Sequence, residues 1–406
     1  MALLDPESNG LKFEIHEEAP PRPKIRVIGV GGAGSNAVAH IMAGGMEGVE
    51  FWVVNTDLQA LRASPVPNKL AIGSRITGGQ GAGGDPEVGR QAALEDTERL
   101  LEVLQGASMV FIAAGLGRGT GTGAAPVIAS MARQMDALTA AMVTKPFTVE
   151  GPQRMELAEE GLQKLAEAVD ALITVPNDRL LALAPRGASI LEAFRMAHEI
   201  MRRAVQEIVE IIQTHGLINR DFADIRSVMR SGGLAVLGTA VARGENAAVE
   251  AARQAINCPL VEGASLAGAR NVLVHVTGSS RLGIHELHEA CQVVREATRR
   301  PDAEVSLGVV LNESMADAVK VSVIATGFTS VPEAETASFD ESWRAIPGAP
   351  APSQPAQAAE AAVPLPAGFT ARDEVAEPDL TEPAEDDYDL EDLDTPAFRR
   401  RRRLTR

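Results

Sequence analysis

Aromatic residues are scarce in this chain: they make up 3% of its 406 residues, although hydrophobic residues make up 45%. A core with so few rings must be filled by Leu, Ile, Val, Ala and Met side chains. The length is ample for a large core and predicts two or three domains.

Cysteine is also scarce, since only Cys258 and Cys291 occur. Two cysteines in a chain of this length exclude a disulfide framework, and we expect two buried or partly buried thiols. The sequence has no Cys-x-x-Cys motif and no cluster of histidines, so no metal site built from protein ligands alone is predicted.

Two further absences concern location and partners. Residues 1–23, expected to form a flexible tail, lack the basic start and apolar segment of a signal peptide, and no apolar run approaches the ~18–20 residues of a membrane span. The net charge is −17, and residues 331–398 hold 17 acidic and 2 basic residues. We therefore expect a soluble, cytoplasmic protein that does not bind nucleic acid.

The most informative feature that is present is a pair of glycine-rich loops. Residues 29–36 (GVGGAGSN) follow the apolar segment 25–28, and residues 115–123 (GLGRGTGTG) follow the apolar segment 109–114. Glycine lets backbone N–H groups approach an anion without a Cβ in the way. Two such loops at the ends of neighbouring strands would cradle a run of phosphates, so the sequence predicts nucleotide binding.

Strands are expected at 25–28, 51–54, 109–114, 138–143 and 171–175, alternating with helices that include one over about 87–106 and one from about 125. This alternation predicts a parallel sheet covered on both faces, with its ligand at the carboxyl ends of the strands.

The second half of the chain predicts a further layer. A helix over about 189–215 has apolar residues at helical spacing and is expected to be buried between two layers. Within 225–328, strands are expected at 271–276, 304–310 and 320–324, with helices at about 245–255 and 285–297. Residues 329–385 lack periodicity and are rich in Ala, Pro, Glu and Asp, which predicts a disordered linker.

The first loop leaves alternatives open when taken alone. Its spacing Gly29-x-Gly31-x-x-Gly34, with Asp57 about 20 residues on, also fits an NAD-dependent oxidoreductase or a strand–helix turn without a ligand. A dehydrogenase needs one phosphate loop, whereas the hydroxyls of Thr120 and Thr122 in the second suit the extra oxygens of a triphosphate. No Gly-x-x-x-x-Gly-Lys-Ser/Thr motif occurs.

The combination of motifs resembles the tubulin/FtsZ family. Residues 117–123 resemble the family's GGGTGTG signature, and the resemblance covers about residues 24–328 nearly continuously, plus the last dozen or so. The other segments that carry it are VIGVGGAGSNAV (27–38), VNTD (54–57), GAGGDPEVGR (81–90), TKPF (144–147), PNDRL (176–180), GLINRDFADIRSVM (216–229) and LDTPAF (393–398).

The resemblance implies an α/β fold of the tubulin/FtsZ type. A Rossmann-like, parallel-sheet GTP-binding domain (24–188) would be joined by a central helix (189–215) and a synergy loop (216–224) to a second α/β domain (225–328). The linker 329–385 and a peptide at 386–406 would follow. The implied activity is that of a GTPase that forms head-to-tail filaments and scaffolds the bacterial division ring.

The resemblance also implies a nucleotide site. Residues 32–36 would face phosphate, the loop around Thr120 would hold the β- and γ-phosphates at a helix N-terminus, and Glu150 would accept from the ribose. By themselves, Glu150 and Arg154 would be a surface ion pair and Phe194 a core position. The implied contacts are Gly31, Gly32, Ala33, Gly34, Ser35, Asn36, Gly83, Gly117, Arg118, Gly119, Thr120, Gly121, Thr122, Gly123, Glu150, Arg154, Asn177, Phe194 and His198.

In this family the synergy loop enters the nucleotide pocket of the next subunit. The resemblance therefore implies catalytic roles for Asn219, Asp221 and Asp224, with a carboxylate orienting water for attack on the γ-phosphate. Taken alone, two such aspartates would be solvated loop residues. GTP or GDP is the implied ligand, with Mg²⁺ carried by the nucleotide.

Two residues depart from the family pattern. Arg118 replaces a glycine of the signature, where it is either strained by roughly 1–3 kcal/mol, if φ is positive, or reaches the phosphates. His198 stands where the family usually has Asp or Asn paired with guanine, and a neutral imidazole offers one acceptor unless Glu199 substitutes. These departures motivate an alternative: a nucleotide-binding paralogue with weak hydrolysis that co-assembles with or regulates another FtsZ.

The resemblance implies partners besides the chain itself. Residues 393–403 would bind division proteins and membrane tethers, placing the protein at mid-cell beneath the membrane, although Thr395 and Arg399 stand where Ile and Leu are common. The run of five arginines from Arg399 is a candidate contact for anionic lipid, worth ~1 kcal/mol per basic residue, or else a solvated charge run.

Overall fold

The structure, a computed structural model, describes residues 23–183, 189–214, 216–218, 222–230, 233–257 and 266–328. The predicted N-terminal tail up to residue 22, the predicted linker, the C-terminal peptide and Cys258 lie outside these ranges. Cys291 is partly buried, as expected. No helix within the described ranges is long and apolar enough to cross a membrane.

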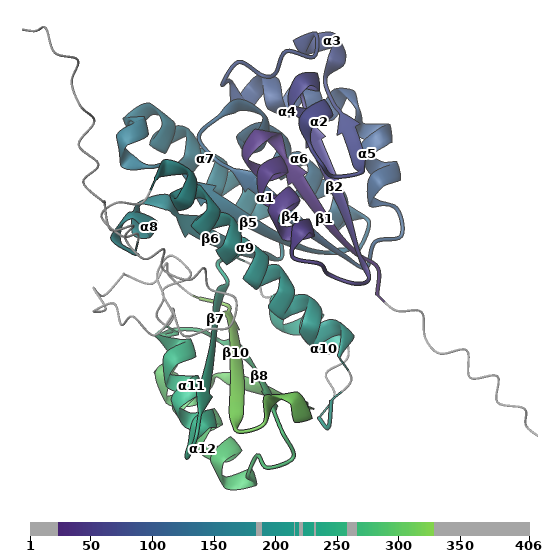
Figure 1. The fold of residues 1–406 in the computed structure, drawn as a ribbon. Coiled ribbons are helices and arrows are strands. Elements are labelled where there is room, and N and C mark those ends of the chain that lie inside the picture. The colour runs from purple at the N-terminus through teal and green to yellow at the C-terminus, as the bar shows by residue number, and fades with distance from the viewer. Residues whose placement is uncertain are drawn as a thin grey trace, which may run out of the picture. The chain divides into compact units, whose positions relative to one another are not determined.

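The first layer is a sheet of six parallel strands in the order β3-β2-β1-β4-β5-β6 (Figure 1). This confirms the predicted parallel sheet. Register aligns Val30 at the end of β1 with Ala114 near the end of β4, so the two glycine loops leave the same edge. The strands are β1 (Ile25–Val30), β2 (Val49–Asn55), β3 (Asn68–Ala71), β4 (Met109–Gly115), β5 (Leu138–Lys145) and β6 (Ala171–Pro176).

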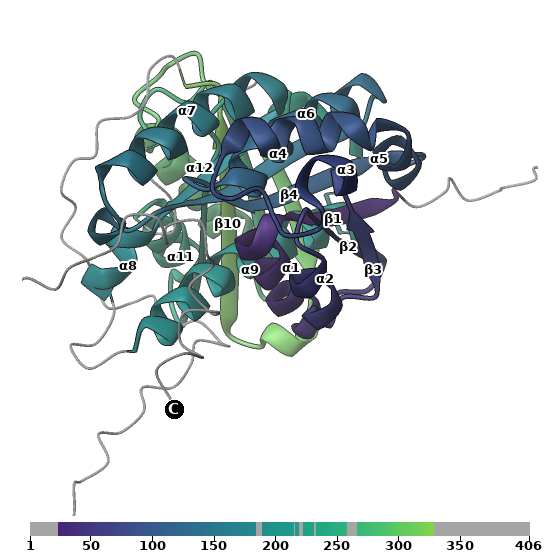
Figure 2. The ribbon, with the colours of Figure 1, turned by 90° about the horizontal axis from the view of Figure 1, so that it is seen from above.

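Helices cover both faces of this sheet (Figures 1 and 2). On one face, α1 (Gly31–Ala43) and α9 (Ile190–Gln213) pack against Val27 and Phe111, whereas the other face packs Ile28 and Ile112. That second face is covered by α4 (Pro86–Glu95), α5 (Thr97–Leu104), α6 (Gly119–Gln134) and α7 (Pro152–Ala168). Both clusters are almost wholly aliphatic, as the composition predicts.

Trp52 of β2 is an exception to the aliphatic pattern. Its partly buried ring packs against the α4–α7 face of the sheet, and its indole N–H is buried without a hydrogen-bond partner. The short helices α2 (Leu58–Ala63) and α3 (Ser74–Thr77) and the 3-10 turn Thr148–Glu150 lie in connections between strands of this layer. Helix α8 (Asn177–Leu183) follows β6 and precedes α9.

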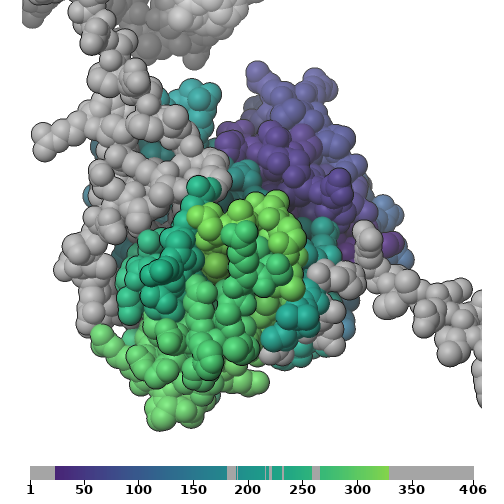
Figure 3. Space-filling view, turned by 60° about the horizontal axis from the view of Figure 1, so that its bottom comes forward, coloured from purple at the N-terminus to yellow at the C-terminus, as the bar shows by residue number. Residues whose placement is uncertain are grey.

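The second layer is a mixed sheet in the order β7-β10-β8-β9. Strand β10 (Ala318–Thr326) is antiparallel to β7 (Val236–Arg243) and β8 (Asn271–Gly278), whereas β9 (Glu304–Leu311) is parallel to β8. Helices α11 (Ala247–Ile256) and α12 (Ile284–Ala297) cover one face, and the green surface in Figure 3 belongs to this layer. The structure also has a 3-10 turn at Glu313–Met315.

Helix α9 lies between the two sheets, as predicted. Its residue Met201 shares one hydrophobic cluster with Phe111 of the first sheet and with Leu237 and Ile324 of the second. The backbone also joins the two layers, because Leu172 of β6 donates to Gly233 at 2.9 Å and accepts from Ala235 at 2.8 Å.

The single helix predicted over 87–106 is two helices. Asp96 interrupts it with φ −105° and ψ 29°, and its carboxylate accepts from the Gly73 N–H at 2.7 Å and from Arg99 at 3.0 Å. The prediction failed because this carboxylate serves a turn that lies 23 residues earlier in the chain. Strands β3 and β7 were not predicted.

Candidate nucleotide site

The first glycine loop is an abrupt change from strand to helix. Val30 is extended, and Gly31 has φ +72°, where a side chain would be strained. A Cβ at Gly34 would lie 2.2 Å from the Ala113 carbonyl oxygen, whereas a Cβ at Gly32 would meet nothing within 4 Å. The first turn of α1 is therefore pressed against β4 on one side and faces open space on the other.

The second glycine loop turns into α6 at Gly119, six residues earlier than predicted. Gly117 takes the left-handed conformation at φ +89°, and the Thr122 hydroxyl accepts from the N–H groups of Gly117 and Arg118 at 3.0 and 3.1 Å. Arg118 itself is extended, with φ −131° and ψ −177°. The strain considered for Arg118 is therefore absent, and its exposed side chain occupies an ordinary backbone position.

The structure brings the two loops together. A Cβ at Gly31 would lie 2.9 Å from the backbone nitrogen of Gly121, and the buried hydroxyls of Thr56 and Thr120 lie 2.7 Å apart. Two helix N-termini, those of α1 and α6, thus meet at the carboxyl edge of the sheet. Their backbone N–H groups and dipoles favour an anion there. Sequence reasoning gave Thr56 no role, although it lies in the VNTD segment.

The surroundings fit a polar ligand. The Ser35 hydroxyl and the side-chain oxygen of Asn177 are buried without a hydrogen-bond partner. Buried polar atoms are rarely left unpaired, so these two are suited to the phosphates or sugar of a nucleotide. The loop that contains Gly83 packs against the start of α6, where a Cβ at Gly119 would lie 2.9 Å from the Asp85 oxygen.

The side chains expected near the sugar and base are also grouped. Glu150 accepts from the Phe147 N–H at 2.9 Å and pairs with Arg154 at 2.5 Å, which is the ion pair that the spacing alone predicts. The ring of Phe194, on α9, meets that of Phe147 edge-on with centroids 5.5 Å apart. Phe194 is 37% exposed, so it is available for stacking rather than enclosed in the core.

His198 lies beside a second histidine, and its pKa is lowered. Its ring packs against that of His40 with centroids 6.0 Å apart, and burial, followed by the nearby His40, lowers the pKa of His198 to about 4. At neutral pH the imidazole is therefore uncharged and offers one hydrogen-bond acceptor.

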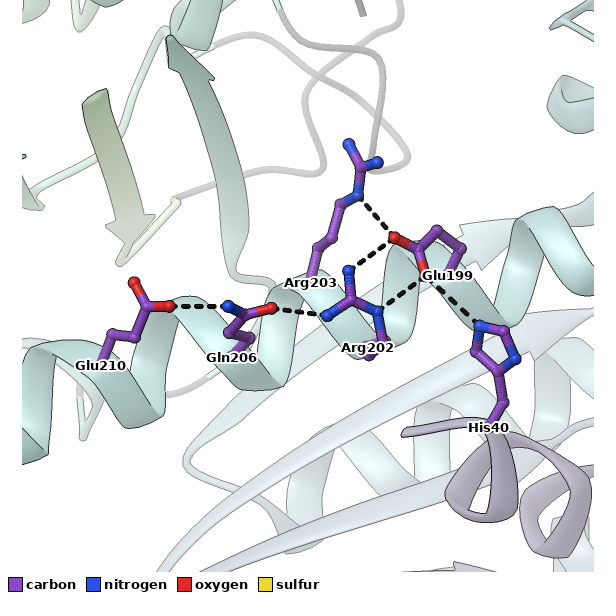
Figure 4. A network of polar contacts seen from close by, with 6 residues as sticks. All are labelled: His40, Glu199, Arg202, Arg203, Gln206 and Glu210. Atoms are coloured by element: carbon purple, nitrogen blue, oxygen red, sulfur yellow. Dashed lines mark hydrogen bonds and ion pairs between the residues drawn. The ribbon is translucent and has the colours of Figure 1, made fainter. Parts of the chain in front are cut away.

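Glu199 does not substitute for the missing acid, because its carboxylate is occupied (Figure 4). It accepts from Arg202 at 2.7 Å and Arg203 at 3.0 Å, and lies 3.3 Å from His40 of α1. Burial raises the pKa of Glu199, but the hydrogen bonds from the two arginines outweigh it and lower the pKa to about 2.

The predicted catalytic loop is described only in part. Asn219 and Asp221 lie outside the described residues, whereas Asp224 lies in the first turn of α10 (Phe222–Met229). Before the loop, Ile218 exchanges two backbone hydrogen bonds of 3.2 Å with Val309 of β9. Among the described residues, no group of three or more His, Cys, Asp or Glu side chains is placed to hold a metal ion.

Helix α10 and the glycine loops lie at opposite edges of the first sheet. Arg226 of α10 contacts Asp136, which stands two residues before β5 begins at Leu138 and thus at the amino edge of the parallel sheet. The glycine loops leave the carboxyl edge. A strand of seven residues such as β4 separates the two edges by ~20 Å. Asp224 therefore does not reach the glycine loops of its own subunit.

Two family profiles match the chain. The profile of the tubulin/FtsZ family GTPase domain matches residues 24–185, and that of the FtsZ family C-terminal domain matches residues 233–329. The cell division protein FtsZ of Pseudomonas putida is 49% identical over 315 residues, which are 78% of this chain and 79% of the relative. That of Coxiella burnetii is 47% identical over 318 residues, which are 78% of this chain and 82% of the relative.

Solved structures agree with this relationship. The empty FtsZ dimer of M. jannaschii has a TM-score of 0.68 at 37% identity, covering 79% of this chain and 96% of that one. CetZ2 from Haloferax volcanii, solved as a GTPγS-bound protofilament, has a TM-score of 0.66 at 25% identity over 79% of this chain and 96% of its own.

The fold and the paired loops thus define a GTPase of the tubulin-like class, which binds GTP and GDP. The chain belongs to the FtsZ family. The oxidoreductase alternative is wrong, and the comparisons favour the filament-forming division GTPase over the slowly hydrolysing paralogue.

Proposed function

We propose that this chain forms head-to-tail filaments in which the acidic loop of one subunit completes the nucleotide pocket of the next. The observation that carries the proposal is the placement of α10 and the glycine loops at opposite edges of one sheet. An arrangement with two different complementary surfaces joins subunits end to end instead of closing a dimer. The FtsZ dimer and the CetZ2 protofilament among the similar structures are consistent with it.

Each group has a proposed role in GTP hydrolysis. The backbone N–H groups at the starts of α1 and α6 hold the phosphates, and Glu150, Asn177 and Phe194 hold the sugar and base. Asp221 or Asp224 from the neighbouring subunit orients the attacking water. Mg²⁺ bound to the nucleotide neutralises phosphate charge.

The filaments would scaffold division at mid-cell, beneath the cytoplasmic membrane. We propose that residues 393–403 bind division proteins and membrane tethers, because the preceding acidic segment and the following arginines form a peptide distinct in composition from the linker. The arginine run adds attraction to anionic lipid.

The rate of phosphate release against protein concentration tests the shared site. With GTP and Mg²⁺, the rate should rise more than linearly with concentration, because association creates the active sites. Asp224→Ala should bind GTP normally and lose hydrolysis, whereas Glu289→Ala, which removes an exposed acid from α12, should behave as the parent protein. A strictly linear rate would point to a site complete within one subunit.

Mixing two inactive variants is the sharper test. Gly32→Asp places a carboxylate in the open space beside the loop, where it repels phosphate but leaves the acidic loop intact. In a 1:1 mixture with Asp224→Ala, about a quarter of random interfaces pair an intact pocket with an intact loop. The mixture should regain about that fraction of the parent rate, and a mixture as inactive as its components contradicts the proposal.

A further inference from the structure

The helix that carries Asp224 is fixed on its inner face by packing. Ile225 and Met229 are buried in the cluster that contains α9, and the Thr326 hydroxyl of β10 donates to the Val228 carbonyl at 2.6 Å. Arg226 lies on another face of α10, and Arg230, four residues further on, directly follows the last residue of the helix. Two like charges at this spacing repel each other unless an acid lies between them.

Asp136 is that acid, and it binds both arginines. Arg226 donates to a carboxylate oxygen of Asp136 at 2.9 Å and to its carbonyl oxygen at 2.7 Å. Arg230 donates to the other carboxylate oxygen at 2.5 Å. The Arg226 guanidinium also lies 5.4 Å from the centre of the Phe222 ring, at the start of α10. One residue thus binds α10 through three acceptor atoms.

The backbone conformation of Asp136 is one that usually selects glycine, so an aspartate at this position calls for an explanation. It has φ +61° directly after the last turn of α6, a position where helices usually end on glycine. Aspartate tolerates this conformation less well than glycine does. A carboxylate that accepts hydrogen bonds from both Arg226 and Arg230 accounts for an acid at a position that favours glycine.

Helix α6 also gives Asp136 a rigid base. Its 16 residues span about 24 Å, begin at the second glycine loop and are packed in the cluster on the α4–α7 face. Asp136 therefore connects α10 to a helix that is itself fixed at the nucleotide edge of the sheet.

We propose that Asp136 is a positioning residue for GTP hydrolysis: through Arg226 and Arg230 it holds α10, and with it Asp224, in the orientation that completes the neighbouring subunit's pocket. This inference rests on the proposed sharing of the site between subunits. It concerns the orientation of the donated loop and leaves the subunit's own nucleotide binding unaffected.

Asp136→Gly is the first test, because glycine keeps the left-handed turn and removes the carboxylate. We expect kcat at saturating protein and GTP to fall about tenfold, with KM for GTP within about twofold and the thermal midpoint within a few degrees. Asp302→Gly, which removes an exposed acid paired with Arg300, is the control and should leave kcat unchanged. In an Arg226→Ala/Arg230→Ala background, Asp136→Gly should have no further effect.

Mixed filaments show which subunit carries the defect. The mixture of Gly32→Asp and Asp224→Ala is the reference. Adding Asp136→Gly to the loop donor, Gly32→Asp, should lower the regained rate about tenfold. Adding it to the pocket donor, Asp224→Ala, should leave the regained rate unchanged.

The outcomes separate the two proposals. A reference mixture without activity contradicts the shared site itself. An active reference with equal rates in the two Asp136→Gly arms, or with the loss in the pocket-donor arm, overturns the positioning role of Asp136 and leaves the shared site standing.

Discussion

The proposed nucleotide site includes His198, which would set the number of acceptors offered to the purine base. A carboxylate would accept from both the N1–H and the 2-amino group of guanine, whereas the neutral imidazole accepts one hydrogen bond. Glu199, the adjacent acid, is held by Arg202 and Arg203. Discrimination that depends on the 2-amino group should therefore be weak in this protein.

We predict that His198→Asp increases the preference for GTP over ITP, which lacks the 2-amino group. A hydrogen bond from that group to a carboxylate is worth about 1.5–3 kcal/mol, so the ratio of kcat/KM values should rise at least tenfold. Parallel hydrolysis assays with the two nucleotides measure the ratio. His288→Asp, an exposed change on α12, is the control, and an unchanged ratio for His198→Asp would remove this residue from base recognition.

Single residues also show what the sequence could and could not predict about the site. Glycine spacing located both loops, because a close approach of backbones demands glycine whatever surrounds it. The conformation of Arg118 was not predictable, since it depends on Gly117 taking the positive φ instead. Helical spacing alone places Arg202 and Arg203 within reach of Glu199, whereas its contact with His40, which is 159 residues away, could not be predicted.

At the scale of elements, all strands of the first sheet except β3 were predicted, because each of them is a short apolar run that ends at a loop. Helix α6 begins earlier than propensity allows: its first turns are GTGTG, a poor helical sequence. These turns pack so closely against α4 that only glycine fits: a Cβ at Gly123 would lie 1.8 Å from the carbonyl oxygen of Pro86. Tertiary packing, and not helix propensity, therefore determines the helix there. Strand β7 was missed because its glycine and alanines give no clear alternation.

Helix α9 and strand β10 are joined by charges, of which Glu207 is buried and Lys320 and Glu210 are partly exposed. Lys320 lies 3.3 Å from Glu207 and 2.5 Å from Glu210, and the Ser322 hydroxyl donates to Glu207 at 2.5 Å. Burial lowers the pKa of Lys320, but the two carboxylates outweigh it and raise that pKa. Lys320, Glu207 and Glu210 line a cleft of about 500 Å³ between α9 and the second sheet.

Lys320→Met should destabilise the protein by roughly 2–4 kcal/mol, because it leaves two carboxylates facing each other without a cation. Adding Glu207→Gln should recover part of that loss. Urea unfolding followed by circular dichroism measures both. Arg253→Met removes an exposed pair with Glu250 on α11 and should cost less than about 1 kcal/mol. Equal costs for the two single variants would show that the Lys320–Glu207–Glu210 group stabilises the fold no more than an exposed pair does.

At the scale of the whole molecule, the buried His275 and the partly buried His198 make stability depend on pH. Burial, with smaller effects of His40 on one and Lys320 on the other, lowers the pKa of His198 and that of His275 from 6.5 to about 4. The unfolded chain binds these protons at higher pH than the folded chain does. The stabilisation is thus complete above pH 6.5 and is lost as pH falls from 6.5 to about 4.

We predict that the free energy of unfolding falls between pH 6.5 and 4.5, with each histidine contributing up to about 1.4 kcal/mol per pH unit. Glu199, whose pKa is lowered to about 2, loses its contribution only below its ordinary value of 4.5. Urea titrations at several pH values measure the slope. His275→Gln should reduce it, whereas His285→Gln, exposed on α12, should not. A slope unaffected by His275→Gln would assign the pH dependence to other groups.

The indole of Trp52 gives one half of this protein an optical label that the other half lacks. The described residues from β7 to β10 contain neither tryptophan nor tyrosine, so no tryptophan emission arises from the second sheet. With Trp343→Phe, the remaining emission would come from β2 alone. Comparing its loss with the loss of the far-ultraviolet signal would therefore reveal whether the two sheets melt as one cooperative unit or in sequence.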